Sequence, residues 1–117
     1  MRMWMTDPTG MCRKHLLGEH VEIHMLAGTL DRGKSIQGHL DRGQLEPQNM
    51  RRRHAALVKE MKRRGYKHRS PLSCSATAIP KGRVDVKASE RELVSRCPDC
   101  RARRKEVRRT SDPSAAG

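Results

Sequence analysis

Hydrophobic residues between positions 7 and 30 recur at the spacing of an α-helix. At about 100° per residue they fall into two stripes on nearly opposite faces: Leu16, Ile23, Ala27 and Leu30 on one, and Leu17, Val21 and Met25 on the other. A helix that is apolar on two sides is usually buried in the middle of a small domain. We therefore predict a buried helix from Asp7 to Leu30, beginning at the Asp7-Pro8 turn or one turn later.

A second helix is predicted after Pro47, because proline often occupies the first position of a helix. Its inward positions recur at i, i+4, i+7, i+8 and i+11: Met50, His54, Leu57, Val58 and Met61. Its last turn is basic and is followed by Gly65, which suits the helix dipole and a glycine at C′. Between the two helices, Leu-Asp-Arg-Gly occurs at 30–33 and again at 40–43. We predict two turns there, the first ending the first helix, around an irregular connection.

The chain after residue 70 has a different character. Ser, Pro, Ala and Gly dominate from Ser70 to Gly82, which predicts a surface loop. A third helix is expected from Ser89, with Glu92 as its capping-box partner, followed by a basic helix or arm to residue 109. The sequence therefore predicts an all-α protein with a small compact helical core at 1–72 and irregular connections. Residues 73–109 would form a loop plus a short basic helix packing on that core, and 110–117 a disordered tail.

Composition narrows the partners of this chain. Its 117 residues suffice for one domain, and with Trp4 and Tyr66 as its only Trp and Tyr, and no Phe, the core must be thin. The 26 Lys and Arg against 13 Asp and Glu give a net charge of +13, which is typical of nucleic-acid-binding proteins. No apolar run suits a membrane span or a signal peptide, and four cysteines are too few for a secreted disulfide framework. We therefore expect a cytoplasmic protein with no membrane partner.

Basic residues cover the polar side of the second predicted helix: Arg51, Arg52, Arg53, Lys59, Lys62 and Arg63. Like charges on one face repel each other, so such a surface costs stability unless an anionic partner neutralises it. An electrostatic footprint for phosphate is therefore a better interpretation than a merely solvated face.

A strip of ionisable residues lies between the two stripes of the first helix, where His15, Glu19 and Glu22 follow at i, i+4 and i+7. Burying such a strip costs folding free energy unless its side chains are solvated, paired with each other or part of a functional site. The alternative to a functional site is a solvated helix edge with a His–Glu pair. His20 and His24 have a spacing that would suit a metal on one helix face. Because no third ligand is evident, we interpret them as solvated or core-edge histidines.

Two short motifs add candidate ligand sites. Residues 28–35 satisfy G-x-x-x-x-G-K-S, but this phosphate-binding motif needs a buried strand before it and a long helix after it, and neither is predicted. Cys97 and Cys100 form a C-x-x-C pair, which suits half of a tetrahedral zinc site. Cys74, with or without Cys12, would complete it and clamp the C-terminal part onto the first helix, with free buried thiols as the alternative.

Three short runs together resemble the phage endonuclease V type of pyrimidine-dimer DNA glycosylase: Met1-Arg2, residues 15–22 and residues 63–66. In that family a short N-terminal arm leads into a helix that carries a His and, seven residues later, the catalytic Glu. His15 and Glu22 have this spacing. A later family helix ends in Lys-Arg-Gly and an aromatic residue, and the run at 63–66 is similar. The resemblance spans roughly residues 1–70.

The resemblance implies an all-helical DNA-repair enzyme whose nucleophile is the α-amine of the first residue, here Met1, next to Arg2. Arg is too large a second residue for the usual removal of the initiator methionine. An α-amine is less basic than a lysine side chain, so more of it is neutral near pH 7. It would attack C1′ of a damaged nucleotide, displace the base and form a Schiff base, from which β-elimination nicks the strand.

The other site residues follow from the same resemblance. Glu22 would stabilise the developing positive charge and shuttle protons, and His15 would orient Glu22 or contact a phosphate. The flipped-out nucleotide and strained duplex would be held by basic groups outside the second helix as well: Arg2, Arg13 and Lys14. The chain departs from the family at Val21 and Met25, where the family has basic residues, and it lacks the family's aromatic C-terminal tail.

The sequence therefore predicts a monomeric glycosylase and abasic-site lyase that acts on double-stranded DNA in the cytoplasm of a bacterial or phage-infected cell. No cofactor is expected for catalysis, and a structural zinc at Cys97 and Cys100 is a candidate. Two alternatives stay open: a non-catalytic basic nucleic-acid-binding module, with or without a zinc ion, and a small nucleotide-binding protein that uses residues 28–35.

Overall fold

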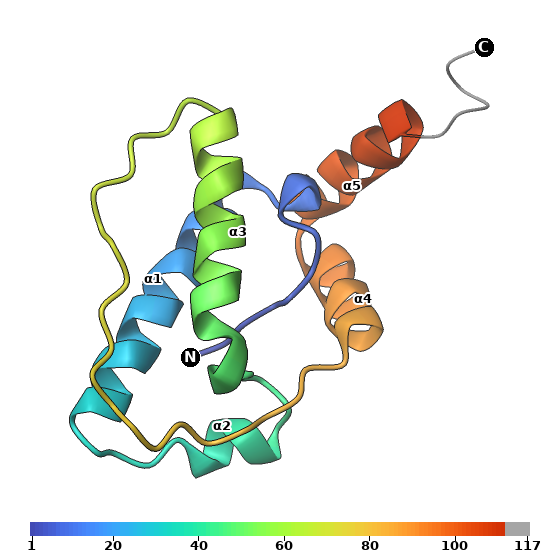
Figure 1. The fold of residues 1–117 in the computed structure, drawn as a ribbon. Coiled ribbons are helices and arrows are strands. Elements are labelled where there is room, and N and C mark those ends of the chain that lie inside the picture. Colours follow the sequence, from blue (N-terminus) through green and yellow to red (C-terminus); the bar gives the residue numbers. More distant parts are fainter. Residues whose placement is uncertain (112–117) are drawn as a thin grey trace.

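The structure, a computed structural model, describes residues 1–111. Over that range it contains five α-helices and no strand: α1 (Arg13–Asp31), α2 (Gln37–Asp41), α3 (Met50–Arg63), α4 (Val86–Arg96) and α5 (Pro98–Ser111). The predicted all-α class is confirmed. Helices α1 and α3 lie side by side, α4 and α5 lie at the other end of the molecule, and the N-terminal segment runs between them (Figure 1). Of the predicted disordered tail at 110–117, the first two residues belong to α5 and the rest lie outside the described residues.

Half of the predicted two-sided pattern of α1 is confirmed. Leu16 and Ile23 of the first stripe are fully buried, and this face packs against α3. Val21 and Met25 of the second stripe are instead 55% and 53% exposed. The prediction of a centrally buried helix is wrong, because α1 packs through one face and leaves the opposite face to solvent. The helix begins at Arg13, since the residues before it form a separate 3-10 turn, η1 (Pro8–Gly10).

Glycines in the left-handed conformation follow three of the helices. Gly33 (φ 67°) and Gly43 (φ 66°) end the two copies of Leu-Asp-Arg-Gly, and Gly65 (φ 84°) follows α3. Residues other than glycine rarely adopt these backbone angles, so each glycine allows the chain to leave its helix. Both repeats are turns, as predicted. The second one ends α2, a short helix within the connection that we predicted to be irregular.

Arg53 departs from the predicted basic face of α3. Its side chain is 6% exposed and donates to both carboxylate oxygens of Glu19, at 2.5 and 2.9 Å. A third N–H donates to the carbonyl of Thr6 at 2.6 Å. Position 53 lies at i+3 from Met50 and i−4 from Leu57, so it belongs to the buried face of the helix. Arg53 is therefore a core residue that joins α3 to α1, and it is not available to DNA.

The first six residues form an extended arm that is buried between the helices. Met3 and Trp4 are 0% and 7% exposed. The N–H of Met3 donates to the carbonyl of Gln44 at 2.8 Å, and the hydroxyl of Ser89 donates to the carbonyl of Trp4 at 2.7 Å. Arg53 of α3 also donates to the carbonyl of Thr6, so three different parts of the chain hold the arm. These anchors determine where the first residue lies.

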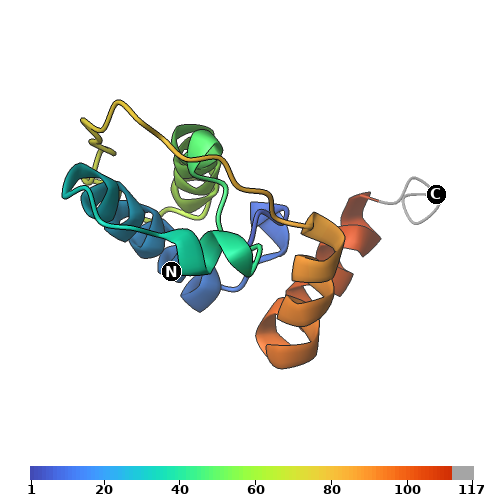
Figure 2. The ribbon, with the colours of Figure 1, turned by 90° about the horizontal axis from the view of Figure 1, so that it is seen from below.

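Helices α4 and α5 pack against this arm and η1, and Figure 2 shows them on the side of the molecule away from α1 and α3. Helix α4 begins at Val86, three residues earlier than predicted, because its N-cap is Asp85, whose carboxylate accepts the N–H of Ala88 at 3.1 Å. Ser89, the predicted cap, lies buried inside the helix. The predicted break at Cys97 is present, and the basic segment after it is helical.

The predicted loop from Ser70 to Gly82 has no regular secondary structure. It runs beside α1 and past α2 before reaching α4 (Figure 1). Asp31, at the end of α1, holds it by accepting the N–H groups of Ser75 and Ala76 at 2.7 and 2.8 Å. Within residues 1–111 no helix has both the length and the apolar character needed to cross a bilayer.

Candidate active site and metal-ligand clusters

Glu22 lies beside the start of the chain. Its Oε2 accepts the backbone N–H of Arg2 at 3.2 Å. Partial burial raises the pKa of the Glu22 carboxyl, and the α-ammonium of Met1 and the N–H of Arg2 act against that rise. The anchored arm therefore places the backbone of Arg2, the residue next to Met1, against this carboxylate.

A surface pocket of about 410 Å³ opens at this point. Its walls come from the arm, from α1 and from the end of α4: Arg2, Trp4, Lys14, His15, Gly18, Glu19, Glu22 and Arg96. Lys14 and Arg96 are exposed. The pocket thus combines two carboxylates, an imidazole and three cations next to the N-terminal arm, a set that suits acid–base chemistry on an anionic substrate.

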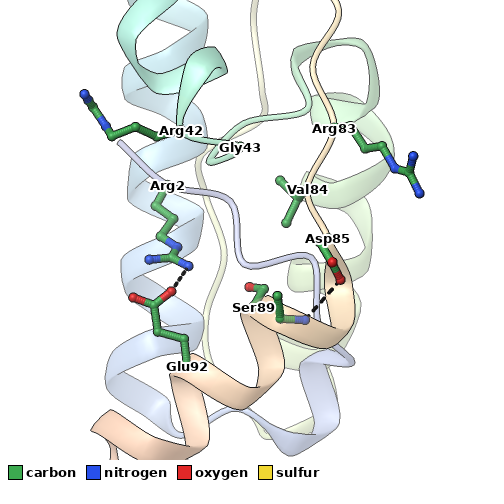
Figure 3. A pocket seen from close by; sticks show the side chains of 9 residues that line it. Arg2, Arg42, Gly43, Arg83, Val84, Asp85, Ser89 and Glu92 are labelled. Carbon is green, nitrogen blue, oxygen red and sulfur yellow. Dashed lines mark hydrogen bonds and ion pairs between the residues drawn. The ribbon is translucent and has the colours of Figure 1, made fainter.

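Arg2 is held by Glu92 and Trp4, two contacts that the sequence did not predict. Its guanidinium forms an ion pair with Glu92 of α4, and its Cζ lies 3.9 Å from the ring centroid of Trp4. It also lines a neighbouring hollow of about 500 Å³, where it points toward Glu92 while Arg42 and Arg83 point outward (Figure 3). No sequence pattern relates residues 90 positions apart, so only the folded chain reveals that α4 helps to place Arg2.

His15 lines the pocket, but its ring also faces a group of cysteines. Its Nδ1 lies 3.2 Å from the Sγ of Cys12 and 3.6 Å from the Sγ of Cys100. The ring packs edge-on against Trp4, with 5.9 Å between centroids. Burial, and then the charge of Lys14, lowers the pKa of His15. The Nδ1 atom therefore faces sulfur rather than Glu22.

The predicted Cys97 and Cys100 pair is joined by Cys12 and His15, and the four ligand atoms lie within 4.8 Å of one another. The Sγ atoms of Cys12 and Cys97 are 3.8 Å apart, too far for a disulfide bond of about 2.05 Å. Cys74, the other cysteine that we considered, lies instead against the C-terminal end of α1. The structure thus assembles three thiols and one imidazole where the sequence indicated half of a site.

Buried thiols in this cluster have displaced pKa values. Burial raises the pKa of Cys100 to about 12. Burial would also raise the pKa of Cys97, but hydrogen bonds from the backbone and side chain of Cys100 lower it below its usual value. Metal ions ionise the thiols that coordinate them.

A second cluster contains four histidines whose ligand nitrogens also lie within 4.8 Å of one another. His20 and His24 come from α1, His54 from α3 and His68 from the loop after α3. The Nε2 atoms of His24 and His54 are 3.2 Å apart, and those of His20 and His68 are 3.1 Å apart. Burial and the three neighbouring imidazoles lower the pKa of His20 to about 4, so this ring is neutral at pH 7. Two partners thus join the pair for which the sequence offered no third ligand.

The residues predicted to bind DNA lie on more than one surface. Arg13 and Lys14 are exposed at the start of α1, and the Cζ of Arg13 lies 4.9 Å from the ring centroid of Tyr66. On α3 the exposed basic residues are Arg51, Arg52, Lys59, Lys62 and Arg63. Apart from the buried Arg53, the basic face of α3 is open to solvent, as a phosphate-binding surface requires.

The match to a phosphate-binding loop at 28–35 does not have the structure that the motif needs. Gly28 lies inside α1, and Gly33 to Ser35 follow the end of that helix. The segment thus comes after a helix rather than a buried strand, and a helix of only five residues follows it. This geometry removes the support for a nucleotide-binding function.

Comparison with known proteins identifies the family. The search of the curated proteins returned no match, and neither did the search of solved structures. A family model described as pyrimidine dimer DNA glycosylase matches residues 1–73, more than half of the 117 residues. The match includes the arm, α1 and α3, with both Met1 and Glu22, and it ends before α4. The chain therefore belongs to the pyrimidine dimer DNA glycosylase family, a family of DNA-repair enzymes whose substrate is DNA.

Proposed function

We propose that this protein is a glycosylase and abasic-site lyase for pyrimidine dimers in double-stranded DNA, and that the α-amine of Met1 is its nucleophile. The observation that carries the proposal is the contact between Glu22 and the start of the chain, 3.2 Å from Oε2 to the backbone nitrogen of Arg2. A carboxylate that contacts the residue next to a terminal amine is placed to accept its proton and to stabilise the cation that forms when the amine attacks.

The chemistry needs one amine and one carboxylate. The α-amine attacks C1′ of the damaged nucleotide, the bond between C1′ and the base breaks, and the base leaves with the electron pair and a proton. The C1′–O4′ bond then opens to give a protonated Schiff base. Loss of a C2′ proton expels the 3′ phosphate and nicks the strand, and water finally releases the amine. Glu22 carries the protons in these steps and stabilises the imine cation.

Positive residues around the pocket suit a DNA substrate. Lys14 and Arg96 are exposed beside Glu22, and Arg2 is oriented by Glu92 and stacked on Trp4. Side chains in these places would bind the phosphates that flank a flipped-out nucleotide, which must leave the duplex to reach the amine. The extension that carries α4, outside the family match, thus contributes to the site.

Borohydride trapping on duplex DNA with an abasic site tests the proposal, because borohydride reduces a Schiff base to a stable amine. We expect a covalent adduct that peptide mapping places at Met1. Acetylation of the N-terminus should abolish the adduct while salt-sensitive DNA binding persists. The absence of any adduct, or an adduct on a lysine, would contradict the role of Met1.

Substitution of Glu22 tests the carboxylate. Glu22→Gln should lower turnover by about 10²–10⁴, the usual contribution of a positioned acid or base, while DNA binding stays near the wild-type level. Glu106→Gln is the matched control, because Glu106 is exposed on α5 away from the pocket. Full turnover in Glu22→Gln would show that Glu22 is not the proton carrier. If trapping and turnover both fail while binding remains, the protein is a non-catalytic nucleic-acid-binding module.

A further inference from the structure

We propose that Cys12, His15, Cys97 and Cys100 bind a structural zinc ion that fastens the C-terminal extension to α1. Three thiolates and one imidazole are a common ligand set for structural zinc in proteins. Two ligands lie at the start of α1 and two at the junction of α4 and α5. An ion held by all four would therefore tie together parts of the chain that are about 85 residues apart.

The distances between the ligand atoms fit one tetrahedral ion. With Zn–S near 2.3 Å and Zn–N near 2.0–2.1 Å, a regular tetrahedron has edges of about 3.8 Å between sulfurs and about 3.6 Å between sulfur and nitrogen. The Sγ atoms of Cys12 and Cys97 are 3.8 Å apart, and Nδ1 of His15 lies 3.2 and 3.6 Å from two sulfurs. These three distances are near the tetrahedral edges, and every pair among the four ligand atoms is within 4.8 Å.

Backbone groups around the cluster also suit thiolates. The N–H of Cys12 points to the Sγ of Cys100 at 3.3 Å, and the N–H of Cys100 points to the Sγ of Cys97 at 3.4 Å. The N–H of His15 points to the Sγ of Cys12 at 3.5 Å. Each sulfur therefore receives a donor that stabilises negative charge, an arrangement typical of the outer shell of metal sites.

The ion would also support the active site. Helix α4 carries Glu92, which pairs with Arg2, and Arg96, which lines the pocket with Glu22. The α4–α5 junction is the point at which the proposed zinc holds these helices to α1. The zinc site would thus fix the position of α4 relative to α1, and the proposal does not depend on the lyase chemistry.

Elemental analysis of the untagged full-length protein tests the zinc site. We expect zinc to be bound, and Cys100→Ser to lose one equivalent while Cys74→Ser, a cysteine outside the cluster, loses none. Cobalt substituted into the wild-type protein should show absorption from sulfur-to-cobalt charge transfer, which only thiolate ligands produce. Chelation should accelerate trypsin cleavage within the Arg-rich α5. A folded wild-type protein that binds neither zinc nor cobalt, or that contains a Cys12–Cys97 disulfide, would overturn the proposal.

A different observation supports a second ion. From the histidine cluster we infer a tetrahedral zinc site made of His20, His24, His54 and His68, which would join α1, α3 and the loop that follows α3. A zinc ion with four nitrogen ligands at 2.0–2.1 Å has edges of about 3.3–3.4 Å between nitrogens. The two closest pairs are 3.1 and 3.2 Å apart, through Nε2 in every ring.

The alternative is a metal-free stack of neutral imidazoles. One N–H···N hydrogen bond within each close pair would satisfy two nitrogens per pair, but it would not require the two pairs to converge. All four nitrogens nevertheless lie within 4.8 Å of one another. A cluster of four ring nitrogens from three parts of the chain is expected for ligands of a single ion.

The same elemental analysis separates the two ions. Wild-type protein should contain two equivalents, His68→Asn should lose one, and His39→Asn, the histidine outside both clusters, should lose none. Because His68 lies on a loop, its replacement leaves the helical ligands in place, and circular dichroism will show whether the fold persists. The His68→Asn protein should keep the cobalt–thiolate absorption and lose only the bands of the nitrogen-liganded ion. A wild-type protein with one equivalent, unaffected by His68→Asn, would overturn the histidine site.

Discussion

The buried pair of Arg53 and Glu19 allows a quantitative test of the core. Their side chains are 6% and 0% exposed, and the guanidinium makes two hydrogen bonds to the carboxylate and one to the carbonyl of Thr6. Arg53→Met removes all three bonds and leaves a carboxylate in the core without its partner. Loss of one member of a buried pair costs about 3–5 kcal/mol. At about 4 °C per kcal/mol for a domain of this size, we expect Tm to fall by roughly 12–20 °C.

Two further variants separate the pair from its surroundings. Changing Glu19 and Arg53 together to Met should recover most of the loss, because apolar side chains of similar volume often replace a buried ion pair at little cost. Arg52→Met, at the neighbouring exposed position, should change stability by no more than about 0.5 kcal/mol. Thermal unfolding followed by circular dichroism, at one pH and one metal content, measures all three.

DNA binding by the same proteins tests the placement of Arg53 on the buried face. Each cation that neutralises a phosphate adds about 0.9 to the slope of log affinity against log salt. The double Met variant should keep the wild-type slope, whereas Arg52→Met should reduce it by about 0.9 if α3 lies on DNA. Arg53→Met with a Tm within about 3 °C of the wild type, or a double variant with a reduced slope, would refute the buried pair.

Three further predictions follow from the surface and the packing. Hydrogen bonding by Arg63 lowers the pKa of Glu60, so the ionised Glu60 stabilises the fold above its unfolded pKa, and this contribution disappears as pH falls through the lower folded pKa. Glu60→Gln should therefore lower Tm at pH 7, and the Tm values of variant and wild type should converge in acid. Val21→Arg should raise DNA affinity and increase the salt slope by about 0.9, since Val21 is exposed on the helix that carries the site; an unchanged slope would place it away from DNA. Gly82→Ala should cost about 1–3 kcal/mol in urea unfolding, because a Cβ there would lie 2.2 Å from the carbonyl oxygen of Leu45, and a neutral result would show that this backbone yields easily.

Hydrophobic periodicity predicted where the helices lie along the chain, but it did not predict which of their faces are buried. Helix α3 was identified from one clear stripe, of which Met50, His54, Leu57 and Met61 are buried and Val58 is half-buried. In α1 the same reasoning identified two stripes, and only one is covered. Local spacing reports which residues share a face, whereas burial depends on whether another part of the chain lies against that face. The exposure of Val21 and Met25 could not be read from their own segment.

The candidate site shows the same division. Met1 and Glu22 were predicted from a short family motif, and the structure brings their segments together. The pairing of Glu92 with Arg2 and the inclusion of His15 among the cysteines were not predicted, because the contacts Arg2–Glu92 and His15–Cys100 span 90 and 85 positions and leave no local pattern. Arg53 was assigned to the polar face on charge alone. Its burial depends on Glu19, which is 34 positions away and compensates its charge.

The anchoring of the N-terminal arm by α4 has a consequence for the order of events during synthesis. Arg2 is synthesised 90 residues before its ion-pair partner Glu92. Until α4 is made, the arm lacks both this ion pair and the hydrogen bond from the Ser89 hydroxyl to the carbonyl of Trp4. Contacts of such high sequence separation form late in folding. A nascent or truncated chain that lacks α4 would therefore lack two of the contacts that hold the arm beside Glu22.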